Sequence, residues 1–212
     1  WVQRGFQILT LLIFIPSTLH VFNWIASLWQ GRIPDSARRA VPFKFMIGAI
    51  FFVIYGGVTA FINAQISIDT GFIHNTYWIP AHFHAMFLGF CAQIAMAGVY
   101  FVYPYISGRK YNQTLANIHF WSWQIGIFGK VTMMFLLGLV FFPRWVVDYQ
   151  PLAEWVTPQI VLSASAYLIG FGFLAFIVNL ALSLRNTERV NGDPWPIEDE
   201  FHQPAGAPEP AE

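Results

Sequence analysis

Charged residues and cysteines are scarce in this sequence of 212 residues. Only 10% of its residues are charged, whereas about 25% are charged in ordinary soluble domains. Lysine and arginine together number 11, as do aspartate and glutamate, so no net positive charge would attract a nucleic acid. The single cysteine, Cys91, excludes an intrachain disulfide and a thiolate metal cluster. A soluble, nucleic-acid-binding or disulfide-stabilised protein is therefore not expected.

Apolar residues make up 56% of the sequence and gather in long runs. Five runs are long enough for a membrane helix, which needs about 20 residues. They cover residues 6–28, 41–64, 78–103, 118–142 and 160–184. We therefore predict that residues 1–184 form an all-α, polytopic transmembrane bundle of five helices. Residues 185–212 are rich in proline and acidic residues, which predicts an extended or disordered tail.

Basic residues predict the orientation of this bundle, because they are retained on the cytoplasmic side of membrane helices. Eight of them lie around the first and third connections and after the fifth run: Arg32, Arg38, Arg39, Lys44, Arg109, Lys110, Arg185 and Arg189. Only Arg4 and Arg144 lie at the opposite ends of the runs. We therefore predict a cytoplasmic tail, and an outer face that carries the loops containing His74 and Arg144.

Two histidines at the start of the third run carry most of the functional information. His82 and His84 are two residues apart, so on a helix they project about 200° apart and cannot share one metal ion. Ionisable side chains are costly in lipid and usually mark a functional partner, and axial ligation of haem is a common role for neutral imidazole. The pair therefore predicts two cofactors on two sides of one helix, with hydrogen bonding across the bundle as the alternative.

The motif H-N-T-Y-W-I-P-A-H-F-H, residues 74–84, resembles subunit I of the haem–copper oxygen reductases, the terminal oxidases of respiration. Further segments resemble the same family: Ile15-Pro16-Ser17, Val21-Phe22-Asn23-Trp24, Asn117-Ile118-His119-Phe120 and Phe142-Pro143-Arg144. The resemblance covers residues 6–184 and equates the five predicted helices with helices eight to twelve of a twelve-helix subunit.

The resemblance implies specific roles. His82 would ligate an a-type high-spin haem at the oxygen-reducing centre, and His84 would ligate an a- or b-type low-spin haem. Arg144 would bind haem propionates, since its planar guanidinium matches carboxylates. Ser17 and His20 match positions on a proton path, although His20 stands where many members have lysine or threonine. Copper would belong to the complex, with its ligands outside this chain.

One departure from the family pattern concerns His74 and Asn75. Many members bind magnesium or manganese here with a His-Asp pair, whereas this sequence has a neutral amide. We therefore expect no tightly held divalent ion, and the His-Asn pair resembles the B-type branch. Asp69 precedes His74 by five residues rather than the four of the family pattern, so its role at the propionates has little support from the sequence.

The resemblance implies an enzyme of a prokaryotic plasma membrane that reduces dioxygen to water and couples this reaction to proton translocation. It would act only with the rest of subunit I or a split N-terminal chain, with subunit II, and with cytochrome c, a copper protein or quinol as electron donor. The sequence begins at Trp1 and shows no signal-peptide pattern, which favours the C-terminal part of a longer subunit or a split product.

Two alternatives stay open at this stage. One is the related nitric oxide reductase. The other is a haem-free membrane subunit or proton-conducting transporter, in which His20, Lys130 and His82 would form a relay. For Lys130, packing or snorkelling and a proton-path role are equally compatible with the sequence.

Overall fold

The computed structural model describes residues 2–31, 33, 35–185, 189–190, 192 and 194–195. Its elements are α1 (Val2–Gln30), α2 (Asp35–Arg39), α3 (Val41–Asn63), α4 (Ile66–Ile68), η1 (Asp69–Ile73), α5 (Trp78–His84), η2 (Ala85–Cys91), α6 (Ala92–Ser107), α7 (Gln113–Leu139) and α8 (Ala153–Ser183). The segments η1 and η2 are π-helical. Five helical rods in the described part of the chain are long and apolar enough to cross a membrane, and α5, η2 and α6 form one of them. The predicted five-helix bundle is confirmed.

The predicted limits of the helices differ from the observed ones by several residues. The last helix begins at Ala153, seven residues before the predicted start, and α7 begins at Gln113 rather than residue 118. The first turns of these two helices contain polar residues, whereas the predicted limits follow hydrophobicity alone. The observed helices therefore begin earlier than predicted. The side chain of Asn112 caps α7 by accepting a hydrogen bond from the backbone nitrogen of Leu115 at 2.9 Å.

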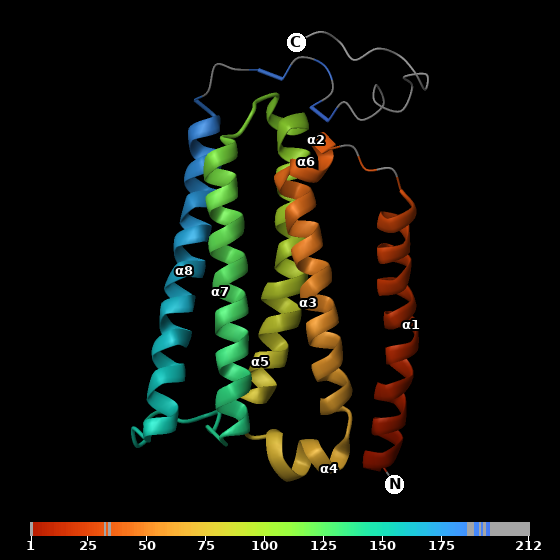
Figure 1. Ribbon diagram of the computed structural model, residues 1–212, viewed down its shortest axis with the longest axis vertical. Helices are drawn as coiled ribbons and strands as arrows, with labels where there is room; N and C mark the ends of the chain where they lie inside the picture. Colours follow the sequence, from red (N-terminus) through yellow and green to blue (C-terminus); the bar gives the residue numbers. More distant parts are fainter. Residues whose placement is uncertain are drawn as a thin grey trace.

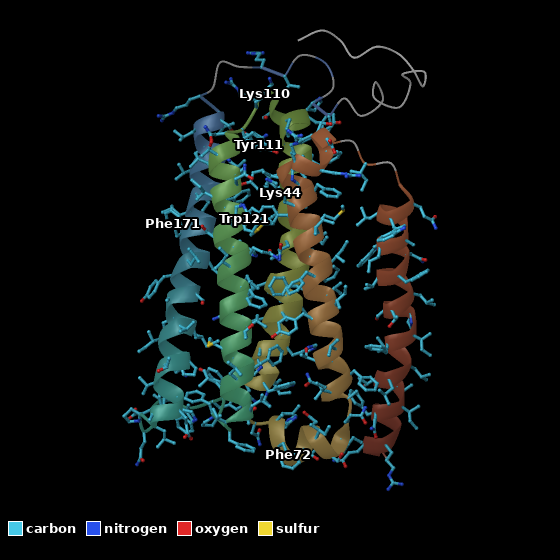
Figure 2. All side chains as sticks on the ribbon, in the orientation of Figure 1. Lys44, Phe72, Lys110, Tyr111, Trp121 and Phe171 are labelled. Atoms are coloured by element: carbon cyan, nitrogen blue, oxygen red, sulfur yellow. The ribbon has the colours of Figure 1, made fainter. Side chains whose placement is uncertain are left out.

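The helices are arranged in a row of unequal spacing (Figure 1). Helices α7 and α8 lie together at one edge, α3 and the α5–α6 rod lie in the middle, and α1 stands at the other edge. Large aromatic side chains such as Trp121 and Phe171 are exposed, as expected of surfaces that face lipid (Figure 2). None of residues 2–30 in α1 is buried, so this helix borders open space rather than a packed core.

The buried core lies between α3, the α5–α6 rod and α7. Its largest fully buried side chains include Phe45, Tyr100 and His119. The hydroxyl of Tyr100 and Nδ1 of His119 lie 3.0 Å apart, and the ring of Phe45 packs on both side chains. Membrane helices gain stability from such close packing and from hydrogen bonds between helices.

The loops gather at two ends of the bundle. The connection between α1 and α3, the connection between α6 and α7, and the described part of the tail lie at one end, here called the tail end (Figure 1). The segments between α3 and α5 and between α7 and α8 lie at the opposite end, here called the Arg144 end. This grouping agrees with the predicted separation of basic loops from the His74 and Arg144 loops.

Part of the predicted disordered tail packs against the bundle. The backbone nitrogen of Val190 donates to the carbonyl of Gly108 at 3.1 Å, and Trp195 donates from Nε1 to the carbonyl of Phe101 at 3.0 Å. The rings of Trp195 and Phe101 also stack. The rest of the tail prediction, including residues 186–188 and 196–212, lies outside the described residues.

Close approach of α5 and α7 depends on Gly138. A Cβ at this position would clash with the backbone nitrogen and Cα of Trp78, which cannot rotate away as a side chain could. We predict that Gly138→Ala costs about 1–3 kcal/mol by overpacking and lowers the thermal stability of the purified protein. Gly170→Ala is the matched control, because a Cβ there meets open space. Equal melting temperatures for the two variants would contradict the prediction.

Candidate functional site

The two histidines of the motif lie in the short helix α5, and the π-helical segment η2 follows directly after His84. Pro80 occupies the first turn of α5, where the missing N–H of proline costs no helical hydrogen bond. Helix α5 begins close to the Arg144 end and carries both imidazoles within its last turn.

His82 is oriented by α3. Its Nδ1 lies 3.0 Å from the hydroxyl oxygen of Thr59, and this hydroxyl donates its own proton to the carbonyl of Gly56 at 2.9 Å. With its proton on the Gly56 carbonyl, the hydroxyl oxygen of Thr59 is placed to accept a hydrogen bond from Nδ1–H of His82. The lone pair of a neutral imidazole then lies on Nε2, which is the arrangement of a metal-ligating histidine whose other nitrogen is held by a second group.

His84 also has its proton on Nδ1, but a different hydrogen bond holds it there. Its Nδ1 donates to the backbone carbonyl of Pro80 at 2.7 Å, which again leaves Nε2 to act as a ligand. His84 is therefore held by its own helix, whereas His82 is held by α3. The two imidazoles therefore face different neighbours, as their spacing predicts.

A large apolar cavity opens beside His82. Its volume is about 670 Å³, within the range of about 300–1,000 Å³ that is usual for small-molecule and cofactor sites. Helices α1 and α3 form its walls, and His82, Met86 and Phe90 close it from the third rod. A flat, largely apolar group with a metal at its centre fits such a space, since it would bring the metal to an imidazole nitrogen.

The structure brings Ser17 and His20 to this same cavity, on the wall formed by α1. The hydroxyl of Ser17 donates to the carbonyl of Ile13 at 2.9 Å, so its oxygen can still accept a hydrogen bond from a neighbour. Lys130 does not line the cavity. The relay of His20, Lys130 and His82 is therefore not assembled around one space.

Arg144 meets the histidine motif at the Arg144 end. Its backbone nitrogen donates to the carbonyl of Asn75 at 3.0 Å, and Tyr77 donates from its backbone nitrogen to the carbonyl of Phe142 at 3.0 Å. Residues Phe141 and Trp145 on either side of this segment have positive φ values of 58° and 69°, a conformation that is uncommon for residues other than glycine. Such strain persists where surrounding contacts hold a side chain in place.

The guanidinium of Arg144 has unused hydrogen-bonding capacity. Its Nε is buried and has no hydrogen-bond partner among the described residues. The guanidinium carbon lies 5.1 Å from the ring centroid of Trp145. A buried, unpaired donor of this kind fits a carboxylate that approaches from outside the described chain.

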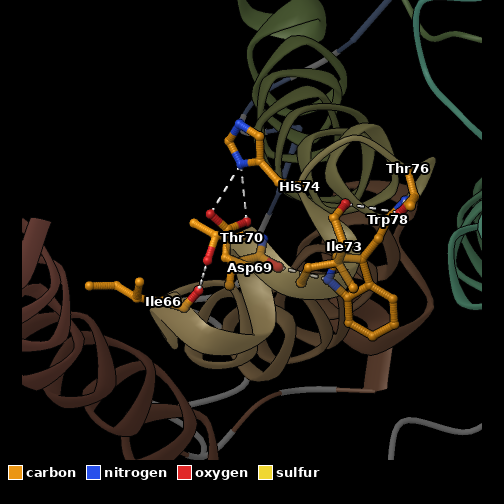
Figure 3. Close-up of polar contacts among 8 residues, drawn as sticks. Ile66, Asp69, Thr70, Ile73, His74, Thr76 and Trp78 are labelled. Carbon is orange, nitrogen blue, oxygen red and sulfur yellow. Dashed lines mark hydrogen bonds and ion pairs between the residues drawn. The ribbon is translucent and has the colours of Figure 1, made fainter.

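His74 pairs with Asp69, whose role had little support from its five-residue spacing. Its Nδ1 lies 3.1 Å and 3.3 Å from the two carboxylate oxygens of Asp69 (Figure 3). The π-helical turn η1 explains the contact, since the backbone nitrogen of His74 donates to the carbonyl of Asp69 at 2.8 Å and so stacks residues five apart. The wider turn of the π-helix therefore accommodates the one additional residue between Asp69 and His74 relative to the family pattern.

Comparisons with known proteins agree with this architecture. The family model described as Cytochrome C and Quinol oxidase polypeptide I matches residues 1–183. Cytochrome c oxidase polypeptide 1 of Halobacterium salinarum is 35% identical over 199 residues, which cover 93% of this chain and 32% of that protein. Quinol oxidase subunit 1 of Bacillus subtilis is 31% identical over 197 residues, which cover 92% of this chain and 30% of that protein.

A solved structure of a haem–copper terminal oxidase dimer has the same fold, with a TM-score of 0.75 at 20% identity over 89% of this chain and 37% of that chain. This chain spans about one third of the length of the curated relatives named above. The family match over residues 1–183 shows that the chain belongs to the family of polypeptide I of the cytochrome c and quinol oxidases.

Proposed function

We propose that this chain is the C-terminal part of subunit I of a haem–copper terminal oxidase, which reduces dioxygen to water and couples the reaction to proton translocation. Family membership and the geometry of His82 and His84 support this proposal. Because the chain spans about one third of its relatives, the complete enzyme also needs the remainder of subunit I or a separate N-terminal chain, and subunit II. Cytochrome c, a copper protein or quinol would donate the electrons.

The observation that carries the proposal is that both histidines of one helix have Nδ1 occupied and face different neighbours. We assign His82 to an a-type high-spin haem in the cavity between α1 and α3, and His84 to an a- or b-type low-spin haem on the side of α7. When bound, the haems and the copper supply electron transfer and oxygen activation. Thr59 and Pro80 hold the two imidazoles in the tautomer that presents Nε2.

Residues at the Arg144 end would hold the polar edge of these groups. The buried Nε of Arg144 would donate to a propionate carboxylate. His74 and Asn75 lie in the adjoining segment, and Asp69 fixes the ring of His74. By the distribution of basic residues, this end would be the outer face of a prokaryotic plasma membrane, and the tail would be cytoplasmic.

Substitution of each histidine tests the haem assignments. We expect His82→Ala to abolish the carbon-monoxide-binding signal of the high-spin haem and to retain much of the low-spin signal, because only one imidazole is removed. His84→Ala should have the opposite effect. Absorption spectra of the purified complex, with Gly170→Ala as a variant away from both histidines, measure this. Retention of both haems in either variant would show the assignment to be wrong, and a haem-free wild-type complex would favour the transporter alternative.

The amide of Asn75 predicts weak binding of divalent ions. Enzyme from cells grown with abundant manganese should contain no stoichiometric manganese at the Arg144 end, because a neutral amide oxygen attracts the ion less than a carboxylate does. Asn75→Asp restores the carboxylate and should increase the bound manganese. Metal analysis and electron paramagnetic resonance provide the measurement, and a six-line signal from one tight site in the wild type would refute the prediction.

His20 and Ser17 are proposed to deliver protons to the cavity beside His82. We expect His20→Leu to slow reduction of the high-spin haem at least about tenfold while reduction of the low-spin haem stays nearly normal, because the arriving electron is not compensated by a proton. Leu19→Ala is the matched control, since Leu19 does not line the cavity. Stopped-flow reduction at the wild-type rate in His20→Leu would place proton uptake on another helix.

A further inference from the structure

Lys130 is the one lysine or arginine in the middle of the five membrane rods of the described chain. The other charged residues of these rods lie near their ends: Arg4, Lys44 and Glu154. An ammonium group at this depth costs about 2.5–3.5 kcal/mol on insertion scales, so it is expected to serve a function. No carboxylate of the described rods lies at its depth, because Glu154 is in the first turn of α8.

The packing of α7 sets the position of Lys130 relative to the motif. Gly138 contacts Trp78 at one end of the interface, and Nε1 of Trp123 donates to the carbonyl of Leu88 at 3.3 Å at the other. Lys130 lies eight residues before Gly138 and seven after Trp123. Since the two rods run in opposite directions, this midpoint faces the midpoint between residues 78 and 88. Lys130 therefore lies at the depth of His84.

Lys130 lies on a largely buried stripe of α7 whose member Trp123 contacts the motif rod, next to the face that packs on α8 through Gly126. Residues at intervals of three and four form one stripe of a helix. The stripe that contains Lys130 includes Trp123, Ile127, Met134 and Leu137, all of which are buried in the bundle. Lys130 itself is half-buried, and its ammonium interacts electrostatically with the imidazole of His84.

We propose that Lys130 supplies a fixed positive charge that raises the reduction potential of the group held by His84. The inference rests on the proposed function, in which His84 ligates the low-spin haem. One-electron reduction adds a negative charge to that haem, and a nearby cation stabilises the reduced form. A unit charge about 10 Å away, at an effective dielectric constant of about 20, changes such an equilibrium roughly tenfold.

The effect should be unequal at the two haems. His82 faces α3 and the cavity on the α1 side, and Lys130 does not line that cavity. Removal of the ammonium should therefore move electrons from the low-spin haem toward the high-spin haem, and leave the potential of the high-spin haem less changed.

Redox titration of the complete oxidase complex, followed by the separate absorption bands of the two haems, tests the inference. We expect Lys130→Met and Lys130→Gln to change the electron distribution between the haems roughly tenfold, which corresponds to a fall of about 59 mV in the low-spin potential for a one-electron couple. Lys130→Arg should keep most of the wild-type potential. Lys44→Met removes a cation near the tail end, where Lys44 bonds to Asn117 at 2.7 Å, and should shift the potential much less.

A wild-type low-spin potential in either neutral variant would overturn the inference. The inference would also be overturned if both neutral variants lost the low-spin haem while Lys130→Arg kept it. The charge would then be needed to retain the haem rather than to set its reduction potential. A different result would contradict the proposed function. If His84→Ala kept an unchanged low-spin haem, His84 would not be its ligand. Loss of that haem in His84→Ala, together with an unchanged potential in Lys130→Met, would refute only the role of Lys130.

Discussion

The hydrogen bond at Nδ1 of each motif histidine is the constraint on which the site depends. In an apolar span every polar group needs an internal partner, so a ring N–H cannot be left to water. His82 finds a hydroxyl on α3, and His84 finds a carbonyl of its own helix. These bonds fix the rotation of each ring and present Nε2 outward. The close approach at Gly138 then sets the position of α5 beside α7.

Much of this arrangement could be predicted from the sequence. Long apolar runs specify five membrane helices because a bilayer allows few other structures, and two-residue spacing on a helix dictates that His82 and His84 face different ways. The helix limits were less predictable. Hydrophobicity indicates which residues lie in the lipid. Capping residues such as Asn112 instead determine where the helical backbone hydrogen bonds begin. The separation of Ser17 and His20 from Lys130 also required the structure, because it depends on which helices share a cavity.

The remaining contacts escaped prediction because they depend on backbone details that periodicity does not encode. Thr59 serves His82 only because α3 presents it at the right rotation, 23 residues away in the sequence. Asp69 reaches His74 through a π-helical turn, which converts an unfavourable spacing into direct contact. Arg144 joins Asn75 through a short bridge between two loops. The sequence did contain one signal for Asp69, since a carboxylate five residues before a histidine comes within reach of it in a π-helical turn.

Helix α5 divides the chain into two unlike environments. On the side of α1 and α3, His82 borders a cavity lined mainly by apolar side chains, with Thr10, Ser17, Thr18 and His20 as polar members on α1. On the side of α7, a largely buried stripe that contains Lys130 lies at the depth of His84. In a low-dielectric interior a single charge acts over long distances, so its position on one side makes two similar histidine sites chemically unequal. Under the proposed assignment, one short helix would hold two haems in environments that differ in charge.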